Sequence, residues 1–284
     1  MKKILLPLAC LVLSALLGAC APKGQMLTSE SDAGNLWQSF VQRSSQPAEY
    51  KVLSGSLRFG PENDTRRVTY LLWSRSDADD SGMKDGHGPA GLDAADFDPD
   101  MPGDTRAIRL EVNAGVGATV AKALFDNGRM LVVLPRDQKA YTGMESTENL
   151  RRLMGLPLPF SMNRLNDFLA GRYMSALDVP APERYLSGND GNIVYRYLSE
   201  GRTCELELNA EALPVRWSMD GRWTLNIAYG DDGLPHKLDG TMDNGEETLR
   251  MVLLVKERRN ADTLPDLSMK LDVPQNVAVY SLDQ

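Results

Sequence analysis

The sequence predicts a mainly β protein of the α+β class, built from antiparallel strands. Two observations carry this prediction. Apolar and polar residues alternate in many short segments, which is typical of antiparallel strands with one buried face. Only three segments have the spacing of amphipathic helices, and strands do not alternate regularly with helices, so a doubly wound parallel sheet is not expected.

The chain begins with a segment typical of an exported precursor. Two lysines precede an apolar run over residues 4–17, which is short for a bilayer span, and Leu17-Gly18-Ala19-Cys20 follows. This pattern resembles the lipobox of bacterial lipoproteins, which implies cleavage of residues 1–19 and acyl chains on Cys20. Ala21, in place of aspartate, then implies the outer membrane. The alternative is an ordinary secretory signal with a chance cysteine.

Charge and cysteine content limit the possible partners. Residues 1–19 carry two of the 31 basic residues, so the remainder has 29 against 39 acidic residues, a net charge of −10. An acidic chain argues against nucleic acid and against broad attraction to anionic headgroups. No later apolar run reaches the ~18 residues of a membrane span, so the N-terminal lipid is the expected attachment. Cys204 lies in an alternating run and is expected to be a small core residue.

The first part of the expected domain, 34–284, combines one helix with five strands. Residues 20–33 are small and polar, as in a tether. Apolar residues including Trp37 and Phe40 predict a helix over 35–46, capped by Ser31 or Asp32. Strands are predicted at 50–59, 67–75, 106–113, 118–125 and 129–134, with Asp126-Asn127-Gly128 as a tight turn.

An acidic insert interrupts these strands. Residues 76–104 are rich in aspartate, glycine and proline, which indicates a solvated loop. Asp96, Asp98 and Asp100 alternate as in calcium loops. The glycine at the sixth place and the glutamate at the twelfth are missing, so no metal site is expected.

The middle of the chain predicts two short helices around a proline turn. Helices are expected at 146–154 and 163–170, separated by Gly155-Leu156-Pro157-Leu158-Pro159-Phe160 and closed by Gly171 as a C-cap. Further strands are expected at 192–198, 203–208, 214–219, 223–229, 236–242, 248–255 and 267–271, with a last short pairing at 277–280.

This order of elements resembles the LolA/LolB superfamily of periplasmic lipoprotein carriers and receptors, over most of residues 35–258. The expected lipid on Cys20 makes the chain more similar to LolB, the outer-membrane receptor. The resemblance implies a half-open antiparallel β-barrel with a helical lid around an apolar cavity that holds acyl chains. The candidate lining residues, each of which is also explained by ordinary core packing, are Leu57, Phe59, Leu72, Val132, Leu158, Phe160, Leu165, Phe168, Leu169 and Trp223.

A second match to LolB concerns the segment Asn113-Ala114-Gly115-Val116-Gly117. LolB carries an exposed leucine on a protruding loop that inserts cargo into the membrane, and Val116 falls at the comparable place. A plain glycine turn is the equal alternative, because valine is smaller than leucine. The acidic insert and the longer C-terminus also depart from LolB.

The sequence gives no signature of catalysis. His87 lies in the acidic insert and His236 follows a turn proline, and the usual nucleophile, nucleotide and metal motifs are absent from the sequence. We therefore expect a non-enzymatic protein without a cofactor. Its expected partners are acyl chains of lipoproteins or another lipid, and a periplasmic LolA-like carrier. The alternative is a non-catalytic scaffold or sensor that binds a protein partner through residues 76–104.

Overall fold

The computed structural model describes residues 29–75, 107–115, 117–260 and 269–283. Within these ranges, fourteen strands form one sheet in the order β14-β6-β5-β4-β3-β2-β1-β13-β12-β11-β10-β9-β8-β7. The strands are β1 Val52–Pro61, β2 Arg66–Arg75, β3 Ala107–Ala114, β4 Ala118–Asp126, β5 Arg129–Leu134, β6 Lys139–Met144, β7 Arg184–Ser187, β8 Ile193–Ser199, β9 Arg202–Leu208, β10 Pro214–Met219, β11 Trp223–Tyr229, β12 Pro235–Asp243, β13 Thr248–Arg259 and β14 Ala278–Ser281.

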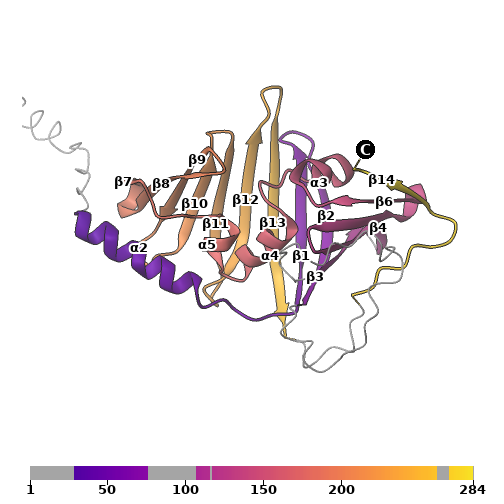
Figure 1. Cartoon of the computed structure of the whole chain (residues 1–284), viewed down its shortest axis with the longest axis horizontal. Coiled ribbons are helices and arrows are strands. Elements are labelled where there is room, and N and C mark those ends of the chain that lie inside the picture. Colours follow the sequence, from indigo (N-terminus) through magenta and orange to yellow (C-terminus); the bar gives the residue numbers. More distant parts are fainter. Residues whose placement is uncertain (1–28, 76–106, 116, 261–268, 284) are drawn as a thin grey trace, which may run out of the picture.

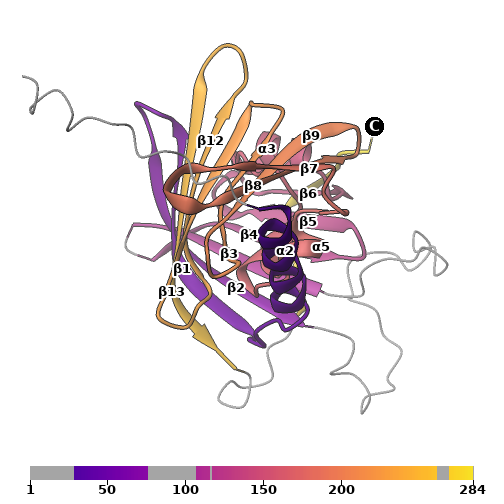
Figure 2. The same ribbon diagram turned by 90° about the vertical axis from the view of Figure 1, so that its left-hand side faces the viewer.

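The sheet is open and strongly curved, as predicted (Figures 1 and 2). Two meanders, β1–β6 and β7–β13, meet where β1 pairs with β13, with Leu57 opposite Leu253. All pairs are antiparallel except β14, which runs parallel to β6. The predicted turn between β4 and β5 is confirmed, with positive φ at Asn127 (48°) and Gly128 (71°).

In the part of the chain that the structure describes, four α-helices accompany the sheet, and Figure 2 shows α2 and α5 inside its curve. They are α2 Glu30–Ser44, α3 Thr147–Met154, α4 Met162–Leu169 and α5 Tyr173–Ala176. The described residues also form two 3₁₀ turns, η4 Pro135–Asp137 and η5 Asn189–Gly191. None of the helices in the described ranges is long and apolar enough to cross a membrane.

Helix α2 begins five residues before the predicted start at 35. The Ser29 side chain, rather than Ser31 or Asp32, caps it by accepting a hydrogen bond from the Asp32 amide at 3.1 Å. Glu30 and Asp32 in the first turn add a favourable interaction with the helix dipole. Ala33 is buried, so residues 30–33 belong to the packed helix and not to the expected tether.

The C-terminal prediction was wrong in its first part. Residues 269–271, the described end of the strand expected at 267–271, form no strand. Leu271 instead packs against a small outer cluster of the sheet that includes Leu124 and Leu131. Leu271 is buried although its segment is irregular, so the apolar–polar alternation at 267–271 wrongly predicted a strand. The last pairing is confirmed as β14.

Strands β6 and β7 and helix α5 were not predicted. Strand β6 carries Gly143, and β7 and α5 each have only four residues. β7 and α5 carry too few residues for a periodic pattern. In β6 the two buried residues, Ala140 and Gly143, lie three positions apart, so burial does not alternate along the strand.

Candidate functional site

A lid formed by α3, the proline segment and α4 lies over the inner face of the sheet (Figure 1). Ser146 caps α3, and Gly155 ends it in the left-handed conformation at φ 66° while its amide donates to the Arg151 carbonyl. The prolines that follow cannot continue a helix. Ser161 then starts α4 by accepting a hydrogen bond from the Arg164 amide at 3.3 Å.

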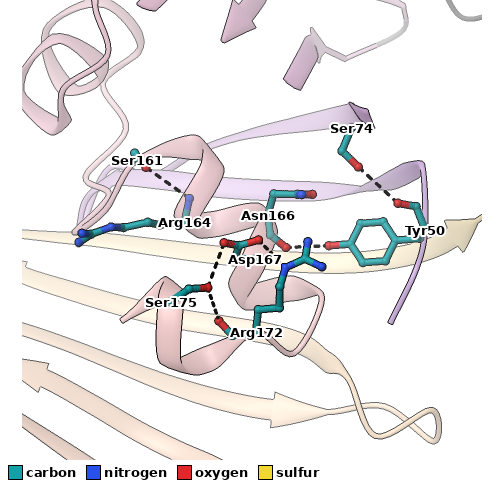
Figure 3. A network of polar contacts seen from close by, with 8 residues as sticks. All are labelled: Tyr50, Ser74, Ser161, Arg164, Asn166, Asp167, Arg172 and Ser175. Carbon is teal, nitrogen blue, oxygen red and sulfur yellow. Dashed lines mark hydrogen bonds and ion pairs between the residues drawn. The ribbon is translucent and has the colours of Figure 1, made fainter. Parts of the chain in front are cut away.

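The end of α4 is fixed by a Schellman motif. Gly171 has φ 85°, its amide donates to the Phe168 carbonyl, and the Arg172 amide donates to the Asp167 carbonyl. The predicted closing role of Gly171 is therefore confirmed, one residue beyond the cap residue Ala170. This turn brings the Arg172 guanidinium back onto the buried Asp167 carboxylate at 2.6 Å, and Ser175 donates to the same carboxylate (Figure 3).

Three further hydrogen bonds hold the lid to the sheet and to the segment before β1. The Tyr50 hydroxyl donates to the Asn166 carbonyl at 3.0 Å (Figure 3), and the Ala48 amide donates to the Ala170 carbonyl at 2.9 Å. At the other end, the Met162 amide donates to the carboxylate of Glu145, just after β6. Burial raises the pKa of Glu145 to about 7, against the opposing effect of this hydrogen bond.

The interior under the lid is apolar and almost filled. A void of about 30 Å³ remains between the lid and strands β1, β2, β3 and β13. Its lining is entirely apolar apart from the Tyr70 hydroxyl, which donates to the Leu254 carbonyl. The lining residues are Leu57, Tyr70, Leu72, Leu110, Val112, Leu156, Leu158, Met162, Leu165, Leu169, Met251 and Leu253.

Aromatic side chains fill the other half of the interior. Phe160 stacks on Phe168 at 6.2 Å and contacts Trp217 of β10 at 6.3 Å. Phe168 meets Tyr173 edge to face, and Tyr173 stacks on Phe40 of α2.

A groove of about 830 Å³ opens at one end of the sheet, beside the lid. Its floor shares Leu57, Val112 and Leu156 with the interior void, so the groove and the apolar interior are adjacent, with these side chains between them. The Phe59 ring lies against the lid, since an added Cβ at Gly155 would come within 3.4 Å of it. The groove is of the size that small-molecule sites usually have.

A second groove of about 360 Å³ lies on the opposite side of the proline segment. It shares Arg151 and Leu156 with the first groove and is lined by Trp223 of β11. The proline segment therefore separates two openings at the same end of the molecule.

The ten predicted lining residues all lie in or against one hydrophobic cluster. Five line the interior void, Phe59 lines the first groove, and Trp223 lines the second. Val132, Phe160 and Phe168 are buried in the core without lining any of these spaces. Cys20 and Val116 lie outside the described residues, as do the acidic insert and His87.

Sequence reasoning missed the charged rim of the first groove. Arg66 precedes Val68 by two residues, so both side chains belong on one face of β2, and this spacing was the available signal. Cys204 is fully buried, as predicted, and this burial raises the pKa of its thiol to about 11. His236 is exposed. No group of three or more metal-ligating side chains lies together among the described residues.

The fold and the site define a class of protein: an open, curved antiparallel sheet with a helical lid over an apolar inner face. No protein-family model matches the sequence, and no curated protein matches it. Among solved structures, a DUF1329 family protein from Desulfovibrio piger is similar at 11% identity and a TM-score of 0.51, over 82% of this chain and 95% of that one.

Two further solved structures have TM-scores just below this value. A LolA superfamily protein from Nitrosomonas europaea has 12% identity and a TM-score of 0.49, over 81% of this chain and 94% of that one. A putative outer membrane lipoprotein-sorting protein domain from Vibrio parahaemolyticus has 12% identity and a TM-score of 0.45, over 82% and 93%. At 11% identity the similarity to the DUF1329 family protein shows the fold alone, and the LolA/LolB-like relationship stays a prediction.

Proposed function

We propose that this protein binds acyl chains of lipoproteins or another amphiphile and helps to insert them into the outer membrane. One observation carries the proposal: the groove of about 830 Å³ adjoins an apolar interior that the lid covers. The predicted lipid on Cys20 would hold the protein at the periplasmic face of that membrane. A LolA-like carrier would deliver the cargo.

Because the interior is closed, an acyl chain can enter it only when the lid shifts. The present void of about 30 Å³ is far below the usual size of a lipid site, whereas the groove is large enough. An acyl chain that first lies in the groove, on Phe59 and Val112, can then displace the Leu156 side chain and enter the interior. Each methylene removed from water contributes about 0.8 kcal/mol, so ten would contribute about 8 kcal/mol before ordering costs, which corresponds to micromolar affinity.

Displacement of a fluorescent fatty acid from the purified protein tests this function. We expect saturable binding at micromolar protein. Ala114→Trp, which fills the groove from β3, should weaken binding at least tenfold. Ala107→Trp is the matched control, because Ala107 is a partly buried alanine of the same strand that does not line the groove. Absence of saturable binding, or equal binding by the two variants, would contradict the proposal.

A second candidate is a non-catalytic scaffold or sensor with a filled core. The nearly filled interior favours it, because such a protein needs no cavity. Its partner would dock on the surface, with residues 76–104 as the expected element. Deletion of 76–104 should then abolish partner capture and leave fatty-acid binding unchanged. The reverse result would eliminate this candidate.

A further inference from the structure

Four arginines line the groove beside the lid. Arg66 and Arg67 begin β2, Arg136 lies in η4, and Arg151 lies on α3. The lining contains three carboxylates, those of Asp64, Asp137 and Glu247. The lining therefore has one more cation than anions, although the protein as a whole has a net charge of −8.

Three of these guanidinium groups are available to a ligand. Arg151 forms an ion pair with Glu148 at 2.8 Å. Within the described ranges, the side chains of Arg66, Arg67 and Arg136 form no ion pair and no hydrogen bond. An unpaired guanidinium offers planar, bidentate donors that fit a phosphate group.

Arg66 stands where the apolar surface ends. It lies opposite Phe59 in the β1–β2 register and two residues before Val68, so the three side chains share one face. Phe59 and Val68 also line the groove, and Val68 is buried. An acyl chain on these apolar residues would place its polar end beside Arg66.

We infer that the groove selects phospholipid-like amphiphiles whose anionic phosphate binds Arg66 and Arg136 while the acyl chain lies on Phe59 and Leu57. This inference rests on the proposed function, because it names the cargo class of the same groove. It is compatible with the acidic composition, since the attraction is confined to the rim of one groove. The three carboxylates of the lining would repel a larger polyanion, so the groove favours a single phosphate headgroup over a polyanion.

The test compares two soluble lipids with the same chains by isothermal titration calorimetry. Dioctanoyl phosphatidylglycerol carries the phosphate, and dioctanoylglycerol lacks it. We expect wild-type protein to bind the phosphate lipid about tenfold more tightly at low salt. Arg66→Gln combined with Arg136→Gln should abolish this preference and leave dioctanoylglycerol binding unchanged. Arg58→Gln is the matched control, because Arg58 is an exposed arginine of β1 outside the groove.

The outcomes separate this inference from the proposed function. Equal affinity of wild-type protein for the two lipids, or a preference that survives in the double variant, would overturn the headgroup assignment and leave acyl binding standing. Failure of both lipids to bind would overturn acyl binding itself. Displacement of the phosphate lipid by millimolar inorganic phosphate alone would show a free-anion site and would overturn the assignment to a lipid.

Discussion

The buried ion pair at the end of the lid gives the sharpest stability prediction. The Asp167 side chain is 4% exposed and pairs with Arg172, which is 29% exposed, at 2.6 Å. Removal of one partner of a buried pair costs about 3–5 kcal/mol. Because Arg172 can turn toward water, we expect Asp167→Ala to lower the free energy of unfolding by about 3 kcal/mol, the low end of that range.

The convex surface offers a matched control for this variant. Glu205 pairs with Arg196, whose side chain is also 29% exposed, but Glu205 itself is 37% exposed. Exposed pairs contribute about 0–1 kcal/mol, so Glu205→Ala should change the free energy of unfolding by less than ~1 kcal/mol. The two variants therefore differ mainly in the burial of the carboxylate.

Urea unfolding measures both losses, and hydrogen exchange locates them. We expect Asp167→Ala to speed exchange of the amides in α4 and α5 before those of β1 and β13, because the lost contacts lie within the lid. A loss below ~1 kcal/mol in Asp167→Ala, or one equal to that of Glu205→Ala, would refute the reasoning that burial makes this pair strong.

Three further predictions concern single residues. Gly55→Ala should destabilise the protein by at least ~2 kcal/mol, because the added Cβ would lie 2.0 Å from the Leu254 carbonyl oxygen. Gly34→Ala should stabilise the protein by ~0.5–1 kcal/mol, because Gly34 lies in α2 with open space around it. Thermal unfolding measures both changes. Burial raises the pKa of Glu145 from 4.5 to about 7, so between these pH values the folded state holds a proton that the unfolded state releases. The free energy of unfolding should therefore fall as the pH rises from 4.5 to about 7. Urea titrations at several pH values should show this fall in the wild-type protein and not in Glu145→Gln. The Cys204 thiol, fully buried and with its pKa raised to about 11, should react with a thiol reagent at pH 8 only after unfolding, and rapid reaction of the native protein would contradict its burial.

Local signals in the sequence predicted most of the fold. Turn and cap chemistry needs only a few neighbouring residues, so Asn127-Gly128, Ser146 and Gly171 were found where the structure has them. Strand alternation located most of the strands but missed the four-residue β7, although its two faces differ in burial. It failed at 267–271, where one buried leucine on an irregular segment has no partner strand.

The candidate site was less predictable, because it depends on volumes summed over distant residues. The sequence placed Leu165 and Phe168 on one face of α4, and both are buried. It did not indicate that Phe168 would stack with Phe160 and fill half of the interior, since this requires the position of Trp217 on β10. Similarly, no local pattern joins Arg66 to Arg136, which are brought to one groove by the pairing of β2, β3, β4 and β5.

The filled interior and the acyl-binding proposal are compatible if the lid and the cargo compete for one surface. Leu156, Leu158, Leu165 and Leu169 cover the inner face of the sheet, and burial of such side chains contributes about 6–12 kcal/mol in total. A chain of about fourteen methylenes gains about 11 kcal/mol on burial. Displacement of all four leucines would therefore cancel most of this gain, so micromolar binding requires that most of them stay buried while the acyl chain lies in the groove. Under the proposed function, such a site would take up its cargo without an energy source and would release it to a bilayer, which offers the acyl chain the same burial without displacing a lid.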